Sequence, residues 1–423
     1  MKKTTSIPAL LLAAVLGCTL LPGCAVSAAP ELAGPEPEPP AAEYWDAAVE
    51  PAALKALTDF TGRTGEQVLR AGENVCYSPV SLYYALSMAA SGAGGETQEE
   101  LLDALGGADA ETLPGWMRAL YGALYRDEKH CKLTLDNSLW MQEGVAFRDS
   151  FTESAAENYY AASYTLDLSA PGAGETIGGW VSEKTHGLLR PSFQLAPDTV
   201  LVLLNTVYFK ANWADEFSRS ATASGEFAAA GGAVTCDFMH TATQGDAVAV
   251  EGYTMASLPF EGSVEMFFLL PDEGETIESL LEERGLASLL DESEAQYRRI
   301  EWSVPKFSVR GEMNLGPMLQ ELGVTDAFDP ARADFSPMCD TTTVPGGSVW
   351  ISEVKQGTAF SIDEEGAEAA AYTEIAAAGS AAPPDETIAM TLDRPFLYGL
   401  RDQQTGAVLF LGRMDDPTKE GAA

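Results

Sequence analysis

IDEEGAEAAAYTEIAAAGSAAPP, residues 362–384, is the stretch that decides the fold of this chain. From Ala367 onward its odd-numbered positions are small or apolar, apart from one threonine. The even-numbered positions between them carry every charge and the one large ring, at Glu368, Tyr372 and Glu374. A period of two predicts a strand with one slim face that can be buried and one face in water. The composition leaves a helix or a disordered linker open as alternatives.

Within this stretch, residues 364–371 read EEGAEAAA and closely resemble the hinge of the serpin family, which usually reads EEGTEAAA. The departure is Ala367, where family inhibitors usually have Thr or Ser. Alanine is still small enough to enter a sheet, so the change concerns the speed of loop insertion more than insertion itself. The resemblance implies a hinge made of Glu364, Glu365, Gly366, Ala367, Glu368, Ala369, Ala370 and Ala371.

Several segments outside the hinge also resemble serpins, in the same order along the chain. Ser78 before Pro79 predicts a helix start, and Ser-Pro-x-Ser is a recurring family motif at such a start. Thr97 and Glu100 predict a capping box for the next helix. Later matches are the apolar run TVLVLLNTVYFK (199–210), which predicts a strand covered on both faces, and the closing hairpin, DRPFLYGL (393–400) with GAVLFLGR (406–413).

The resemblance spans about residues 50–417 and outweighs the multi-domain expectation that 423 residues would otherwise raise. It implies one α+β domain at 47–418 with the serpin fold. That fold has three β-sheets, about eight or nine helices and an exposed reactive-centre loop, here 364–386.

The family's activity implies an irreversible suicide-substrate inhibitor of serine proteases, not an enzyme. The family pattern, counted from Gly366, places the scissile bond at Ser380-Ala381, to within one or two residues. No Lys or Arg lies between Lys355 and Arg394, so trypsin-like enzymes have nothing to cut in the loop. The small residues around the bond suit proteases of elastase or subtilisin type. A non-inhibitory serpin acting as a binding module is the alternative.

Further residues match the region where the family's central sheet opens. Gln356 falls where many members have His, and because Gln cannot titrate, sheet opening should respond little to pH near 6 to 7 at this position. Ordinary core packing is the alternative reading for all of these sheet-opening support residues, which are Ser78, Ser81, Asn205, Gln356 and Trp213.

The N-terminus resembles a bacterial lipoprotein signal (1–24), with Lys2 and Lys3, an apolar run too short to span a membrane, and a candidate lipidated Cys24. Cys18 and ordinary cleavage after Ala28 stay open as alternatives. Residues 25–46, rich in Pro, Glu and Ala, predict a semi-rigid linker. We therefore expect an extracytoplasmic protein, lipid-anchored to the cell envelope or secreted, and monomeric.

Composition narrows the remaining chemistry. A formal charge of −38 disfavours nucleic acid and heparin-like polyanions. The three histidines are far apart and no catalytic or nucleotide-binding motif occurs, so we expect no cofactor and no metal. Cys76, Cys131, Cys236 and Cys339 form no C-x-x-C pair. The expected partner is a target serine protease, held as a covalent acyl-enzyme.

Overall fold

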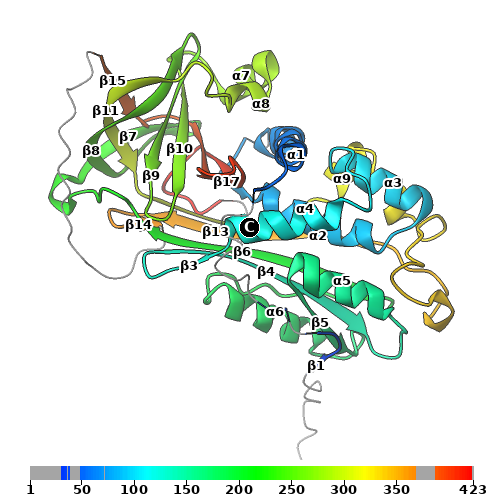
Figure 1. Ribbon diagram of the computed structural model, residues 1–423. Coiled ribbons are helices and arrows are strands. Elements are labelled where there is room, and N and C mark those ends of the chain that lie inside the picture. Colours follow the sequence, from blue (N-terminus) through cyan, green and yellow to red (C-terminus); the bar gives the residue numbers. More distant parts are fainter. Residues whose placement is uncertain (1–29, 36, 39–47, 71, 368–385, 422–423) are drawn as a thin grey trace, which may run out of the picture.

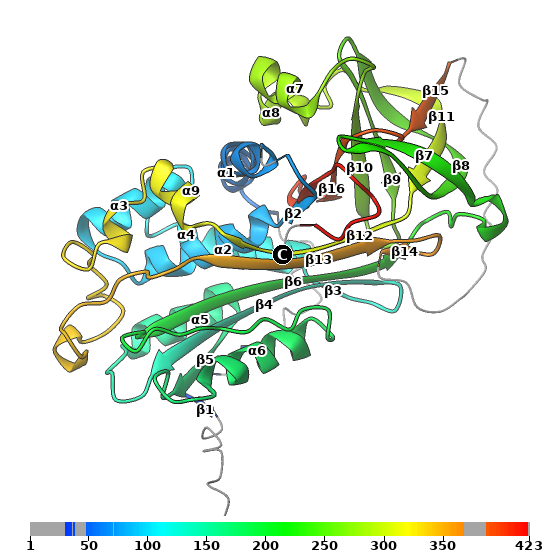
Figure 2. The same ribbon diagram turned by 180° about the vertical axis from the view of Figure 1, so that it is seen from behind.

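The structure is a computed structural model that describes residues 30–35, 37–38, 48–70, 72–367 and 386–421. In this part of the chain the architecture is α+β, with nine helices packed around two hydrogen-bonded sheets (Figures 1 and 2). The helices are α1 Pro51–Leu69, α2 Pro79–Ser91, α3 Gly95–Ala104, α4 Leu113–Leu124, α5 Asp149–Tyr159, α6 Ala173–Lys184, α7 Ile277–Arg284, α8 Leu286–Leu289 and α9 Gly316–Glu321.

The first sheet carries the hinge. Its strand order is β1-β5-β4-β6-β14-β13-β12, with β3 attached to β4. The helix α2 lies on one side of this sheet and α6 on the other (Figures 1 and 2). The strands are β1 Glu31–Leu32, β3 Arg126–Asp127, β4 Cys131–Gln142, β5 Ala161–Leu166, β6 Leu201–Asn212, β12 Phe307–Asn314, β13 Lys355–Ile362 and β14 Gly366–Ala367.

The second sheet has the order β15-β11-β8-β9-β10-β16-β17-β2, with β7 attached to β8. It is continuous because the 19-residue strand β8 pairs with β7 and β11 along most of its length and with β9 at its end. The second and third sheets expected from the sequence therefore run together. The strands are β2 Val75–Tyr77, β7 Ala223–Ala229, β8 Gly232–Val250, β9 Tyr253–Pro259, β10 Val264–Pro271, β11 Gln296–Pro305, β15 Thr387–Thr391, β16 Phe396–Asp402 and β17 Val408–Met414.

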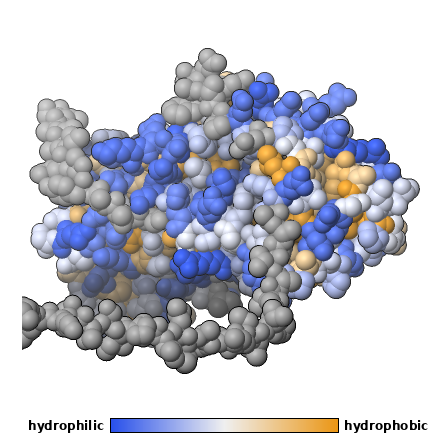
Figure 3. All heavy atoms as spheres, turned by 90° about the horizontal axis from the view of Figure 1, so that it is seen from below, coloured by the Kyte–Doolittle hydropathy of each residue, from blue (hydrophilic) through white to orange (hydrophobic). Residues whose placement is uncertain are grey.

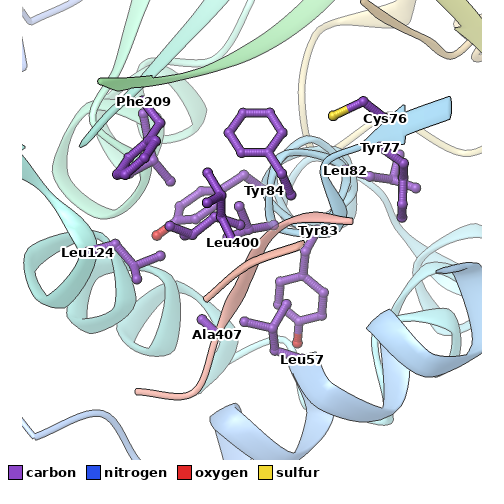
Figure 4. Close-up of a cluster of buried hydrophobic side chains, with 14 of the residues drawn as sticks. Leu57, Cys76, Tyr77, Leu82, Tyr83, Tyr84, Leu124, Phe209, Leu400 and Ala407 are labelled. Carbon is purple, nitrogen blue, oxygen red and sulfur yellow. The ribbon is translucent and has the colours of Figure 1, made fainter. Parts of the chain in front are cut away.

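The helix α2 forms the centre of the largest hydrophobic core. As expected from the sequence, Ser78 caps its N-terminus by accepting a hydrogen bond from the Ser81 amide at 3.3 Å, and Pro79 follows in the first turn. The helix is apolar almost all round because it lies between both sheets and the other helices. Figure 4 shows Leu82, Tyr83 and Tyr84 of α2 among side chains of α1, α4, β6 and β16.

The capping box predicted for the next helix is wrong. The N-cap of helix α3 is Gly94, three residues before the predicted Thr97, and it makes no side-chain capping bond. The Thr97 hydroxyl instead accepts a hydrogen bond from the Asp334 amide. The Glu100 carboxylate accepts hydrogen bonds from the backbone amides of Thr325 and Asp326, at the start of the 3₁₀ turn that follows α9. Contacts distant in sequence therefore occupy both predicted capping side chains.

The linker prediction did not anticipate a strand. Glu31–Leu32 forms β1, which pairs antiparallel with Thr165 and Tyr164 on β5 and becomes the edge of the sheet. The Ala33 amide also donates to the Ser163 carbonyl at 2.8 Å. The expected signal peptide and Cys24 lie outside the described residues. Within the described residues, no helix is long and apolar enough to cross a membrane.

The surface agrees with the acidic composition. On the face seen in Figure 3, hydrophilic side chains cover much of the area and hydrophobic ones form scattered patches. Among the described residues, the large hydrophobic residues that count as exposed are Leu32 and Tyr297, at 44% and 56%.

Candidate functional site

The hinge forms a tight hairpin at one end of the first sheet. The strand β13 ends at Ile362, the chain turns through Asp363, and β14 returns between β13 and β6. Residue 366 must be glycine, because a Cβ there would lie 2.1 Å from the Ala211 carbonyl oxygen and its φ is +156°. Ala367, next along the strand, is buried opposite both Ala211 and Ile362. The alanine that departs from the expected threonine therefore fits within the sheet.

Trp213, directly after β6, holds the turn of this hairpin. Its indole Nε1 donates to the Asp363 carbonyl at 2.9 Å, and its backbone amide donates to the Glu365 carbonyl at 3.0 Å. The ring stacks on Phe260 with the centroids 4.1 Å apart. A buried aromatic with a polar edge is suited to this role because one face packs while its N–H finds a fixed partner. Trp213 therefore lies against the turn of the hinge.

Glu364 ties the hinge to residues outside β6 and β13. Its carboxylate accepts hydrogen bonds from Lys306 Nζ at 2.7 Å and Thr222 Oγ1 at 2.8 Å, and its carbonyl accepts one from the Phe217 amide. Burial acts to raise the pKa of Glu364, but the bonds from Lys306 and Thr222 outweigh it and lower the pKa. The carboxylate is therefore held ionised. Glu365 makes a second, more exposed ion pair with Arg219.

A second group of polar residues lies nearer the start of β13, away from the hinge. The Gln356 side chain is buried and bonds to the backbone of Ser78 twice: its Oε1 accepts from the Ser78 amide at 2.7 Å, and its Nε2 donates to the carbonyl at 2.9 Å. The Ser78 hydroxyl donates to the Leu409 carbonyl at 2.7 Å. Next to it, Thr358 donates to the Cys76 carbonyl at 2.6 Å. These bonds join β13 to the start of α2 and to the second sheet.

The contacts on the β6 side are weaker. The Ser81 hydroxyl donates to the Asn205 carbonyl at 3.4 Å. The Asn205 side-chain amide donates to Asn137 on β4 at 2.6 Å, but its own Oδ1 is buried without a hydrogen bond. The hydroxyl of Thr206 is likewise buried without a partner among the described atoms. Buried polar atoms without a hydrogen bond cost free energy, so the β6 side of the sheet is less well bonded than the β13 side.

A cavity of about 1100 Å³ lies beside these residues. Its walls include the first half of β6, the first residues of β13, the apolar side of α2 and residues 187–196 after α6. Among the described residues, β6 and β13 are joined only through β14, at Ala211, Asn212 and Ile362. The cavity therefore continues the space between the two strands beyond the point where β14 ends.

Three of the five predicted support residues line this cavity, namely Ser81, Asn205 and Gln356. Ser78 is hydrogen-bonded to Gln356, and Trp213 lies at the hinge. Their role in sheet opening stays a prediction. The predicted positions Glu368, Ala369, Ala370, Ala371, Ser380 and Ala381 lie outside the described residues. Sequence reasoning missed Lys306, Thr222 and Arg219, which approach the hinge from 58 to 146 residues away. Nothing in their local sequence signals these contacts.

Other chemistry finds little support within the described chain. No group of three or more His, Cys, Asp or Glu side chains there could hold a metal ion. The four cysteines described are free thiols. Burial raises the pKa of Cys76 to about 12 and that of Cys131 to about 11, so neither thiol resembles an activated nucleophile.

Comparison with known proteins gives a consistent result. The family model described as "Serpin (serine protease inhibitor)" matches residues 55–417. The rice protein "Putative serpin-Z12" is 33% identical over 381 residues, which cover 82% of this chain and 86% of that protein. An uncharacterized serpin-like protein of Thermococcus kodakarensis is 30% identical, covering 87% and 86%.

Solved structures agree with the sequence comparisons. The thermophilic serpin tengpin in its native state has a TM-score of 0.79 at 26% identity, covering 87% of this chain and 95% of its own. Thyroxine-binding globulin in complex with thyroxine has a TM-score of 0.74 at 25% identity, covering 86% and 100%.

Proposed function

Because this chain belongs to the serpin family of serine protease inhibitors, we propose that it is an irreversible suicide-substrate inhibitor of proteases that cut after small residues. The observation that carries this proposal is the position of β14. The hinge already pairs with β6 and β13, and the cavity extends from it between the same two strands. A strand that continues β14 would therefore complete the sheet.

In the proposed reaction the protease's serine hydroxyl attacks the Ser380 carbonyl. The Ser380-Ala381 peptide bond breaks, an ester forms between Ser380 and the protease, and the Ala381 amine leaves with a proton. The freed limb from residue 368 onward then enters the sheet and carries the attached protease with it. Strand addition of this kind, for which serpin loops are a standard example, is driven by main-chain hydrogen bonds.

The energy available fits this task. Residues 368–379 would extend about 40 Å at ~3.3 Å each. At about 1 kcal/mol net for each new hydrogen bond, insertion would release on the order of 10 kcal/mol, which is comparable to the stability of an ordinary domain. The uncut protein is then a kinetic trap. The fit of Ala367 beside Ala211, with 1% of its surface exposed, supports insertion despite the missing threonine.

The target class follows from the loop sequence. The residues Ala378, Gly379, Ser380 and Ala381 suit the small pocket of elastase or subtilisin. We also propose that the protein acts as a monomer outside the cytoplasm of a bacterium, secreted or tethered by a lipid on Cys24. Labelling with a lipid precursor in cells, with Cys24→Ala as the control, tests the tether.

The decisive experiment is incubation with elastase and with subtilisin. We expect an SDS-resistant complex with each protease and a released C-terminal fragment whose mass corresponds to a chain that begins at Ala381. Trypsin should form no complex. Two isomeric variants sharpen the test, because Ala371→Glu puts a charge on the face to be buried and Ala370→Glu puts it on the wet face. Ala371→Glu should be cleaved without forming a complex, whereas Ala370→Glu should still inhibit.

The same reagents separate inhibition from the binding-module alternative. Nicking the loop of an inhibitor should raise its melting temperature sharply, because the inserted strand completes the sheet. Clean cleavage with no complex and no gain in melting temperature would favour a serpin that binds ligands without inhibiting.

A further inference from the structure

The outer edge of β5 is occupied by a strand from the start of the chain. Glu31 and Leu32 form β1, and the Ala33 amide extends the pairing with a hydrogen bond to the Ser163 carbonyl. Figures 1 and 2 show β1 at the margin of the first sheet, away from β14 and the hinge. We propose that this edge is a docking site from which the chain's own residues 31–34 detach when the N-terminal segment is cut off, and that the docked strand slows opening of the sheet. The inference rests on the proposed function and adds a control of its rate.

The sequence limits this strand to a few backbone hydrogen bonds. In an antiparallel pair, the residues that exchange hydrogen bonds with the neighbouring strand occur at every second position. Because Ala33 bonds to Ser163, the position before it that faces β5 is Glu31, and the position after it is Pro35. Proline has no amide hydrogen, so the pairing ends before it.

Side chains add little to the attachment. Within the described chain, the side chains of residues 30–35 form no hydrogen bond or ion pair, and Leu32 stays exposed. The C-terminal segment at the opposite edge of the sheet differs. There the Arg310 amide on β12 donates to the Glu420 carbonyl at 2.6 Å, and four hydrogen bonds to the Asn74 side chain hold the same segment. Of these two edge segments, the N-terminal one is therefore the easier to detach.

Gly34 places the docked strand against two elements at once. A Cβ at this position would lie 3.3 Å from the Cβ atoms of both Ser163 on β5 and Thr152 on α5, so the backbone of Gly34 lies between a strand and a helix. The helix α5 also packs against α2 and α4. In the proposed sheet opening, β5 moves with β4 and β6 because backbone hydrogen bonds join these strands. The docked strand therefore joins the moving strands to the helices and resists the motion.

The free energies of the docked and detached strand are close. Ordering the backbone of residues 31–34 costs conformational entropy that a few backbone hydrogen bonds barely offset. Detachment also lets water reach the Ser163 hydroxyl, which is buried without a partner among the described atoms. In the intact chain, the short connection to α1 keeps the strand at a high effective concentration near β5. Hydrolysis of one peptide bond between Pro35 and Pro51 removes this advantage, so the strand dissociates on dilution.

Amide hydrogen exchange in the full chain tests the docking directly. A recognition sequence for a site-specific protease replaces residues 40–46, and the protein is folded intact before it is cut and diluted. The Thr165 amide faces β1, whereas the Tyr164 amide faces β4, because successive amides of a strand point to opposite neighbours. After cutting, exchange should become about tenfold faster or more at Thr165 and stay unchanged at Tyr164.

Two isomeric peptides provide a matched control. A peptide of residues 30–38, added to the cut protein, should restore slow exchange at Thr165. N-methylation at Ala33 removes the amide hydrogen that bonds to Ser163, whereas N-methylation at Leu32 alters an amide that points away from β5. The peptide methylated at Leu32 should still protect Thr165, and the one methylated at Ala33 should not. Equal protection by both peptides would overturn the docking.

The rate of elastase inhibition tests the coupling to sheet opening. Cutting should raise this rate about fivefold, the factor that one net backbone hydrogen bond supplies, and the unmodified peptide should reverse the gain. Faster exchange at Thr165 without a change in rate would overturn the coupling. A dimer in which Thr165 stays protected after cutting would assign the edge to a second copy of the chain instead of residues 31–34. If the uncut protein does not inhibit elastase, the proposed function and the coupling both fail, while exchange at Thr165 still decides the docking.

Discussion

Replacing Lys306 with methionine should weaken the hinge selectively. Methionine keeps most of the apolar stem but removes the charge that faces the Glu364 carboxylate at 2.7 Å. Only 9% of the Glu364 side chain is exposed, so the variant leaves a largely buried carboxylate with Thr222 as its remaining side-chain partner. Breaking a fully buried pair costs about 3–5 kcal/mol. Lys306 is 37% exposed and solvent screens it, so we expect about 1–2 kcal/mol.

The pH dependence follows from the lowered pKa of Glu364. A carboxyl group whose folded pKa lies below its unfolded value stabilises the protein above the unfolded pKa, and this contribution is lost as pH falls through the folded pKa. At pH 7 the unmodified protein should therefore be more stable than the Lys306→Met variant. The difference should narrow as pH falls below the ordinary glutamate value of about 4.3.

The assay is the apparent guanidinium midpoint of the intact protein, together with the rate at which it converts to a form that resists heating. The Lys306→Met variant should unfold earlier and convert faster. Lys55→Met is the matched control, because Lys55 pairs with Asp59 on the surface with 75% and 51% of the side chains exposed. That variant should shift the stability by less than about 0.5 kcal/mol. Equal effects of the two substitutions would refute the reasoning.

Four further outcomes are expected. The Gly366→Ala variant should displace β14 from the sheet because its Cβ would collide with the Ala211 carbonyl, and faster proteolysis within residues 363–367 would report this. The Gln356→Leu variant should lose about 1–3 kcal/mol, since two buried backbone groups of Ser78 lose their partners. In the unmodified protein, Gln356 cannot titrate, so we expect it to cause little change in the inhibition rate between pH 6 and 7. The Ala33→Pro variant, which removes the amide that donates to β5, should speed proteolysis of the N-terminal segment with less than about 1 kcal/mol lost in stability.

Local patterns predicted those parts of the fold whose neighbours in space are also neighbours in sequence. The start of α2 at Ser78 needed only its own turn, and the strand expected at 199–210 appears as β6 at Leu201–Asn212 because only Asn205 and Thr206 interrupt its apolar run. The α3 cap failed because contacts more than 200 residues away hold Thr97 and Glu100.

The candidate site divides in the same way. The hinge could be found from the sequence because residues 364–371 resemble the hinge of the family, whereas the period of two alone left a helix or a linker open. The partners that hold it could not, because Lys306, Thr222 and Arg219 come from separate elements and are ordinary surface residue types in their local sequence. Likewise, no residue in the linker distinguishes β1, which exists because the edge of β5 offers unpaired backbone groups.

The unequal bonding around the cavity indicates which part of the molecule must move when the sheet opens. Gln356 ties β13 to Ser78 with two short hydrogen bonds, whereas Ser81 reaches β6 through a single bond of 3.4 Å to Asn205. Parting α2 from β6 breaks one weak hydrogen bond in addition to apolar packing, while parting β13 from α2 would leave several buried polar groups without partners. The strand β6 is in turn paired with β4 along 11 residue pairs, and β4 with β5. In the proposed sheet opening, we therefore expect β6, β4 and β5 to move together as one unit, while α2 and β13 stay fixed to the second sheet.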